Sequence, residues 1–158
     1  MLTKSNKLFV SCFYLGFIPF APGTWGSLFG FLFGIFVHIP LALYWLFLFV
    51  VFFISWFLIA QFNDELDPKW IVIDEFLGML LCLLLIKTFG PYWHMFSLGL
   101  AFFFFRLFDI WKPFPISIID EYLLSKKSTQ ALGVIIDDLI AGIMAFGAVY
   151  FVAPPGLY

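Results

Sequence analysis

Five carboxylates lie within otherwise apolar stretches of the chain, on three segments that read IVIDEFLGM, FRLFDIWKPFP and GVIIDDLIAG. They are Asp74, Glu75, Asp109, Asp137 and Asp138. Ionisable groups inside apolar helices are costly and are functional candidates by default. Carboxylates that lie close together repel one another unless a divalent cation or basic side chains neutralise them, and Mg²⁺ prefers carboxylate oxygens. The pattern favours a metal site in which all five are candidate catalytic residues and ligands.

Arg106, Asp109 and Lys112 follow one another at three-residue spacing, which places them near one face of a helix. Arginine offers a planar fork that matches phosphate oxygens, and lysine adds a compact positive charge. Pro113 ends the helix directly after Lys112 and so fixes the position of that charge. We expect Arg106 and Lys112 to bind a phosphate group.

The segment FAPGTWGSL combines a turn signal with two hydroxyl side chains. Pro22 and Gly23 favour a turn, and Thr24 can cap the helix that follows. Free backbone N–H groups at a helix N-terminus suit a phosphate group. Thr24 and Ser27 are therefore candidates for phosphate binding.

Each feature also has a purely structural explanation. Asp74 alone could complement a helix dipole, Arg106 could form a simple ion pair with Asp109, and Thr24 could serve only as a cap. Close helix packing is the expected role of the glycines at four-residue spacing, Gly26, Gly30 and Gly34. A structural explanation of the acidic residues must hold independently on three helices, which favours a shared site.

The elements that carry these residues must lie in a membrane. Of the 158 residues, 64% are hydrophobic and 11% are charged, whereas soluble domains are nearly half apolar and about one quarter charged. A soluble fold of this size cannot hide so much apolar surface. The eight basic residues form no long run, which argues against nucleic acid as a partner. We expect a single domain over residues 1–158, with membrane lipid as its surroundings.

The apolar runs predict an all-α, polytopic membrane bundle of about five helices plus an interfacial amphipathic segment, because a backbone in lipid must satisfy its own hydrogen bonds. The helices are expected at Trp25–Ile39, Leu41–Ala60, Trp70–Phe89, Tyr92–Trp111 and Gly133–Ala153. The amphipathic segment is expected between Pro113 and Leu132. The N-terminal stretch from Leu8 to Phe20 is short for a spanning helix and suits an interfacial or re-entrant element.

The basic residues predict the orientation. If the N-terminus is cytoplasmic and all five segments cross, every basic residue except Lys87 lies inside. The positive-inside rule therefore favours a cytoplasmic N-terminus and an outer C-terminus. The same topology places all ten acidic residues at the cytoplasmic end, so polar chemistry is expected on that face.

The motifs FAPGTWGSL, IVIDEFLGM, FRLFDIWKPFPI and GVIIDDLIAGI, in this order, resemble those of bacterial phosphatidylglycerophosphatase A over roughly residues 20 to 145. The resemblance implies a Mg²⁺-dependent, multi-pass enzyme of the bacterial inner membrane. It implies hydrolysis of phosphatidylglycerophosphate to phosphatidylglycerol and inorganic phosphate. The matching positions are Gly23, Thr24, Gly26, Ser27, Asp74, Glu75, Gly78, Arg106, Asp109, Lys112, Pro113, Pro115, Asp137, Asp138, Ala141 and Gly142.

Two mechanisms and one other function fit these residues. Water activated by Mg²⁺ could attack the phosphate in line, or one carboxylate could act as a covalent nucleophile. A small membrane transporter with an intramembrane acidic site is the alternative function. The acids lie at one end of the predicted helices and not near the midplane, which favours the phosphatase.

Overall fold

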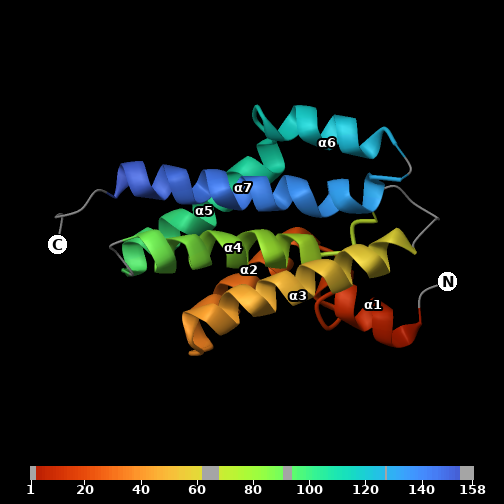
Figure 1. Cartoon of the computed structure of the whole chain (residues 1–158), viewed down its shortest axis with the longest axis horizontal. Coiled ribbons are helices and arrows are strands. Elements are labelled where there is room, and N and C mark those ends of the chain that lie inside the picture. The colour runs from red at the N-terminus through yellow and green to blue at the C-terminus, as the bar shows by residue number, and fades with distance from the viewer. Residues whose placement is uncertain (1–2, 62–67, 91–93, 127, 154–158) are drawn as a thin grey trace.

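The computed structural model describes residues 3–61, 68–90, 94–126 and 128–153. These residues form seven α-helices and a short 3₁₀ helix and contain no β-strand (Figure 1). The prediction of an all-α fold is confirmed. The elements are α1 (Lys4–Val10), η1 (Leu15–Phe17), α2 (Pro22–Phe36), α3 (Leu41–Ala60), α4 (Ile73–Phe89), α5 (Met95–Trp111), α6 (Ile116–Leu124) and α7 (Gln130–Val152).

The five long predicted helices correspond to α2, α3, α4, α5 and α7, and α6 lies within the predicted amphipathic segment. Some boundaries differ. Helix α4 begins at Ile73 and not at Trp70, and α7 begins at Gln130, one turn before the predicted Gly133. Tyr92, the predicted start of α5, lies outside the described residues, and the described helix begins at Met95.

Helix α2 begins earlier than the sequence predicts. Pro22 occupies its first turn, where a fixed φ and a missing N–H are well tolerated. The N-cap residue is Ala21, which has a φ of 48° and no side chain able to accept a hydrogen bond. Thr24 lies inside the first turn, so the prediction that Thr24 caps this helix is wrong.

The stretch from Leu8 to Phe20 contains no continuous helix. Helix α1 ends at Val10, and the next residues Cys12, Phe13 and Tyr14 all have a positive φ, which is incompatible with a right-handed helix. The chain then forms the single turn η1 before it enters α2. This segment therefore carries the chain to the start of α2 as two short elements.

Helix α4 lies at the centre of the bundle, with α7 on one side and α2 and α3 on the other (Figure 1). Its apolar side chains are buried around the whole helix, including Leu77, Leu80 and Leu83. Helix α2 comes close to α4 through its glycines, as predicted. A methyl group at Gly26 would lie 2.6 Å from the carbonyl oxygen of Val72, the residue before α4. Only glycine permits this approach.

Among the described residues, helices α3 and α7 are both long and apolar enough to cross a membrane. The mean hydropathy of α3 is 2.5, and most of its length is not covered by other parts of the chain. Exposed side chains on α3 include Leu46, Phe49 and Phe57. An apolar surface of this kind requires a cover of lipid or protein.

Candidate active site

Three carboxylates from two helices converge at the start of α4. Asp74 and Glu75 lie in the first turn of α4, and Asp138 lies on α7. One oxygen from each side chain lies within 4.8 Å of the other two. Asp74 exposes 7% and Asp138 only 3% of its surface. Three carboxylates so close together in an apolar environment repel one another, so a cation is needed to neutralise their charge.

The donor set of this group fits a hard divalent cation such as Mg²⁺. The Oε2 atom of Glu75 and the Oδ1 atom of Asp138 are buried and accept no hydrogen bond within the described part of the chain. Buried acceptors without donors are costly, and carboxylate oxygens are the ligands that Mg²⁺ prefers. Asp74, Glu75 and Asp138 are therefore the residues that could hold such an ion.

A close contact between two helices brings these carboxylates together. Gly142 of α7 packs directly against the backbone carbonyl of Gly78 on α4. A methyl group at Gly78 would in turn lie 2.5 Å from the carbonyl oxygen of Asp138. Because neither glycine has a side chain, the two backbones meet one turn from the acidic residues. The glycines therefore set the distance between Asp138 and the first turn of α4.

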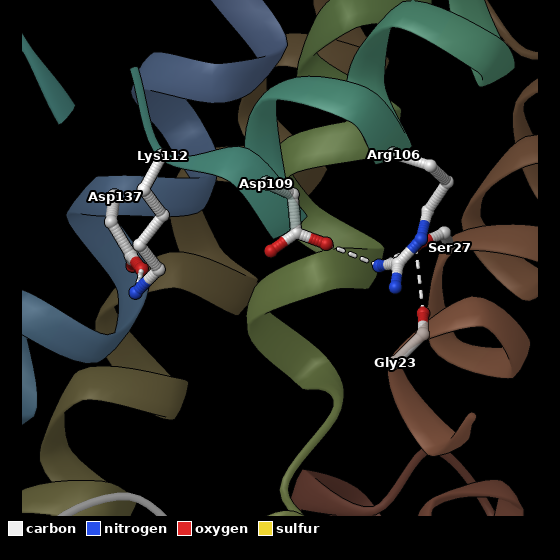
Figure 2. A network of polar contacts seen from close by, with 6 residues as sticks. All are labelled: Gly23, Ser27, Arg106, Asp109, Lys112 and Asp137. Atoms are coloured by element: carbon white, nitrogen blue, oxygen red, sulfur yellow. Dashed lines mark hydrogen bonds and ion pairs between the residues drawn. The ribbon is translucent and has the colours of Figure 1, made fainter. Parts of the chain in front are cut away.

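Arg106 joins α5 to α2 beside this group (Figure 2). Its Nη1 atom donates to Ser27 Oγ at 3.1 Å and also pairs with Asp109, one turn further along α5. Ser27 Oγ itself donates to the carbonyl oxygen of Gly23 at 2.7 Å. The Nε–H group of Arg106 is buried and finds no acceptor among the described residues. This arrangement orients the guanidinium and leaves one buried donor for a ligand.

Two contacts connect Arg106 and Asp109 to the three carboxylates. A side chain at Gly23 would collide with Glu75 Oε1 and would lie 3.3 Å from Arg106 Nη1, so both groups lie against the same glycine. Asp109 lies close enough to Asp138 for the two carboxyl groups to interact. The arginine and the acidic group therefore form one continuous polar site at the meeting point of α2, α4, α5 and α7.

Lys112 and Asp137 form a second group at the edge of this site (Figure 2). Lys112 is the C-cap of α5 and adopts a left-handed conformation with a φ of 45°. Its Nζ atom lies 2.6 Å from Asp137 Oδ2 and 2.8 Å from Asp120 Oδ2. Burial alone would lower the pKa of Lys112, but the two carboxylates raise it above its usual value. The ammonium group therefore stays charged.

The structure thus distributes the predicted site residues over two neighbouring groups. Asp74, Glu75 and Asp138 form the first, with Arg106, Asp109 and Ser27 around it, and Asp137 joins Lys112 in the second. Thr24 lies half-buried in the first turn of α2, one residue after Gly23.

Asp120 also belongs to this region, although the sequence did not indicate it as a site residue. Asp120 lies on α6, which folds back over α7 and so brings this carboxylate to Lys112. Its one signal in the sequence is its place on the polar side of an amphipathic segment, which is also where a solvated acid would lie.

The family model of phosphatidylglycerophosphatase A matches residues 8–153 of the chain. The chain belongs to the phosphatidylglycerophosphatase A family. The resemblance expected from the four motifs is therefore confirmed, and family membership identifies the chain as a phosphatase.

Curated relatives of the phosphatidylglycerophosphatase A family agree with this assignment. The chain is 34% identical over 140 residues to phosphatidylglycerophosphatase A of Haemophilus influenzae, a match that covers 85% of this chain and 80% of the relative. It is 33% identical over 141 residues to the Escherichia coli protein of the same name, covering 87% and 77%. A Bacteroides thetaiotaomicron protein named putative phosphatidylinositol-3-phosphatase is 32% identical over 141 residues, covering 83% and 82%. No solved structure matches the chain.

Proposed function

We propose that the chain is a Mg²⁺-dependent lipid phosphatase that hydrolyses phosphatidylglycerophosphate to phosphatidylglycerol and inorganic phosphate. The observation that carries the proposal is the convergence of Asp74, Glu75 and Asp138 beside Arg106. A metal ion and a guanidinium can each neutralise the charge of a phosphomonoester, which allows a nucleophile to approach the phosphorus. The names of the relatives support the lipid substrate.

Each group of the site has a distinct role in this proposal. A cation held by Asp74, Glu75 and Asp138 would neutralise phosphate charge and favour attack by water. Arg106 donates to the phosphate oxygens through N–H groups that Ser27 and Asp109 leave available.

The remaining predicted residues lie around this centre. Asp109 orients Arg106 and lies beside Asp138. Lys112 adds positive charge at the edge of the site while it holds Asp137, and the Thr24 hydroxyl contributes a further donor at the start of α2. A covalent route through one carboxylate also fits, and a phosphoryl-enzyme trapped after rapid quench would favour that route over direct attack by water.

The proposed location is the bacterial inner membrane, with several spans and the site at the cytoplasmic face. Helix α1 and the end of α7 lie at opposite ends of the long axis of the molecule (Figure 1), which supports an odd number of crossings. With five crossings, every basic residue except Lys87 falls on the side of the N-terminus, which supports a cytoplasmic position for that side.

The test is phosphate release by the detergent-purified protein, with Mg²⁺ and with excess chelator. The substrates are phosphatidylglycerophosphate and phosphatidylinositol 3-phosphate, because the relatives bear both kinds of name. Asp138→Asn is compared with Glu121→Gln, which changes an exposed carboxylate on α6. We expect Mg²⁺-dependent release from phosphatidylglycerophosphate that is lost in Asp138→Asn and kept in Glu121→Gln. Release from the inositol lipid alone would refute the proposed substrate, and no release from either would refute the phosphatase.

A further inference from the structure

A hollow on the outer face of α5 adjoins the site through a single shared residue. Its volume is about 370 Å³, within the range of small-molecule sites, roughly 300–1,000 Å³. The residues that line it are Phe102, Phe103, Arg106, Leu107, Ile110 and Trp111. Arg106 is the one charged member, and it is also the residue that contacts Ser27 and Asp109 in the site.

Arg106 lines this hollow with the apolar part of its side chain, while its guanidinium contacts Ser27 and Asp109 in the site. All the other lining side chains are apolar or aromatic, and they extend along α5 on both sides of the arginine. Phe103 exposes 58%, Ile110 72% and Trp111 71% of its surface. A ligand that extends from the hollow to the guanidinium must therefore be apolar inside the hollow and carry an anion beyond it. A phospholipid, with its phosphate groups next to its acyl chains, has this distribution.

We propose that this hollow binds an acyl chain of the lipid substrate while the phosphorylated headgroup lies at Arg106 and the three carboxylates. The substrate then reaches the site from the side of α5, within the bilayer, and its chain does not leave the apolar phase. This inference rests on the proposed lipid phosphatase function and adds to it the place where the lipid tail is held.

The chain offers a matched control for this proposal. Phe103 on α5 and Phe49 on α3 are exposed to 58% and 59%, and each makes an aromatic contact with a phenylalanine of its own helix. Phe49 does not line the hollow. Truncation of either ring removes a similar exposed apolar area. A difference in KM between the two variants therefore depends on the position of the ring and not on the loss of apolar surface.

The experiment measures KM and kcat of wild type, Phe103→Ala, Ile110→Ala and Phe49→Ala on two substrates. One is long-chain phosphatidylglycerophosphate in mixed micelles, and the other is its deacylated, water-soluble headgroup. We expect Phe103→Ala and Ile110→Ala to raise KM for the long-chain lipid by about fivefold to tenfold. Their kcat values, and KM for the deacylated substrate, should match wild type, and Phe49→Ala should match wild type on both substrates.

The outcomes separate this proposal from the function on which it rests. Phosphate release by wild type supports the phosphatase whatever the variants do. With that release established, equal effects on both substrates, or the same KM change in Phe49→Ala, would overturn the acyl-chain site. A wild type that cleaves neither substrate would overturn the phosphatase first, and the acyl-chain site with it.

A labelling experiment gives a second readout that does not depend on turnover. A phosphatidylglycerophosphate analogue with a photoreactive group on its acyl chain should label the α5 peptide around residues 102–111. Arg106→Ala should reduce that labelling, because the headgroup is no longer held beside the hollow. Labelling spread equally over α3 and α5, unchanged by Arg106→Ala, would contradict the proposal.

Discussion

Ser27 Oγ on α2 accepts a hydrogen bond from Arg106 Nη1 on α5, although 79 residues separate the two along the chain. Because Ser27 is fully buried and also donates to the carbonyl oxygen of Gly23, its hydroxyl oxygen has a fixed position. The arginine is therefore held in place from two sides, by Ser27 and by Asp109. In the proposed role of Arg106 as a phosphate-binding residue, a guanidinium that is already oriented loses less entropy when the substrate arrives.

Removal of this hydroxyl should lower activity without unfolding the protein. Ser27→Ala is expected to reduce kcat/KM about tenfold, since one charge-assisted hydrogen bond that positions Arg106 is lost. Ser55→Ala is the matched control. Ser55 is equally buried and makes the same bond to the carbonyl oxygen four residues earlier, at 2.7 Å, but it lies on α3, and within the described residues it forms no hydrogen bond with Arg106. Equal losses in the two variants would contradict a positioning role for Ser27.

The contact between Gly78 and Gly142 makes a prediction about stability. Gly142→Ala places a methyl group against the Gly78 carbonyl and should destabilise the protein by about 1–3 kcal/mol, as overpacking does elsewhere. Activity should fall as well, because Asp138 moves relative to α4. Gly147→Ala on the same helix meets no atom within 4 Å and should be neutral or slightly stabilising. Thermal unfolding in detergent measures the stability of the two variants. An unchanged stability of Gly142→Ala would argue against close packing of Gly142 on Gly78.

Repulsion within the acidic group should appear in the response to Mg²⁺. Asp138→Asn removes one of three neighbouring charges, so the metal-free protein should unfold at a higher temperature than wild type. Wild type should be stabilised by Mg²⁺, by about 2.7 kcal/mol at a hundredfold excess over Kd, and Asp138→Asn should lose most of this gain. Glu121→Gln should respond as wild type does. Full Mg²⁺ stabilisation of Asp138→Asn would exclude Asp138 as a ligand.

The pairing of Lys112 with Asp137 and Asp120 predicts a coupling that a double-mutant cycle can measure. Lys112→Met leaves two partly buried carboxylates without their cation and should cost about 2 kcal/mol of stability. Asp137→Asn added to Lys112→Met should restore part of the lost stability, because it removes one of the two carboxylates that have no cation. Lys126→Met, which removes an exposed lysine bonded to Tyr122, should have little effect. Additive losses in the double variant would show that Lys112 and Asp137 are not coupled.

Much of the fold could be predicted because long apolar runs form helices whose backbones satisfy their own hydrogen bonds. The prolines mark two of the boundaries, since α3 begins directly after Pro40 and α5 ends at Trp111, just before Lys112 and Pro113. The motifs also predicted which residues meet, since they lie at the same end of several helices. The division of Asp137 and Asp138 between two groups could not be predicted. Neighbouring residues point about 100° apart on a helix, and the rotation of α7 that decides their directions is set by packing against α4.

The start of α2 was mispredicted for a similar reason. Thr24 is a good cap by type, but Pro22 favours an earlier first turn, and Gly23 lets that turn approach Glu75. The start of α2 is therefore set by two factors, the helix preference of Pro22 and the contact of Gly23 with Glu75. The sequence shows the first factor and not the second. Asp120 was missed because its neighbour Lys112 is reached only after α6 folds back.

In the proposed multi-pass arrangement, the direct backbone contact of Gly78 with Gly142 has a consequence in membranes of different thickness. Helices adapt to a thicker or thinner bilayer by tilting, at a cost of fractions of a kcal/mol per Å. Two helices locked backbone to backbone tilt as one body, because separating them would open a gap at the contact. Their carboxylates should then keep their spacing while the pair leans, so catalysis is insulated from the acyl-chain composition of the host membrane.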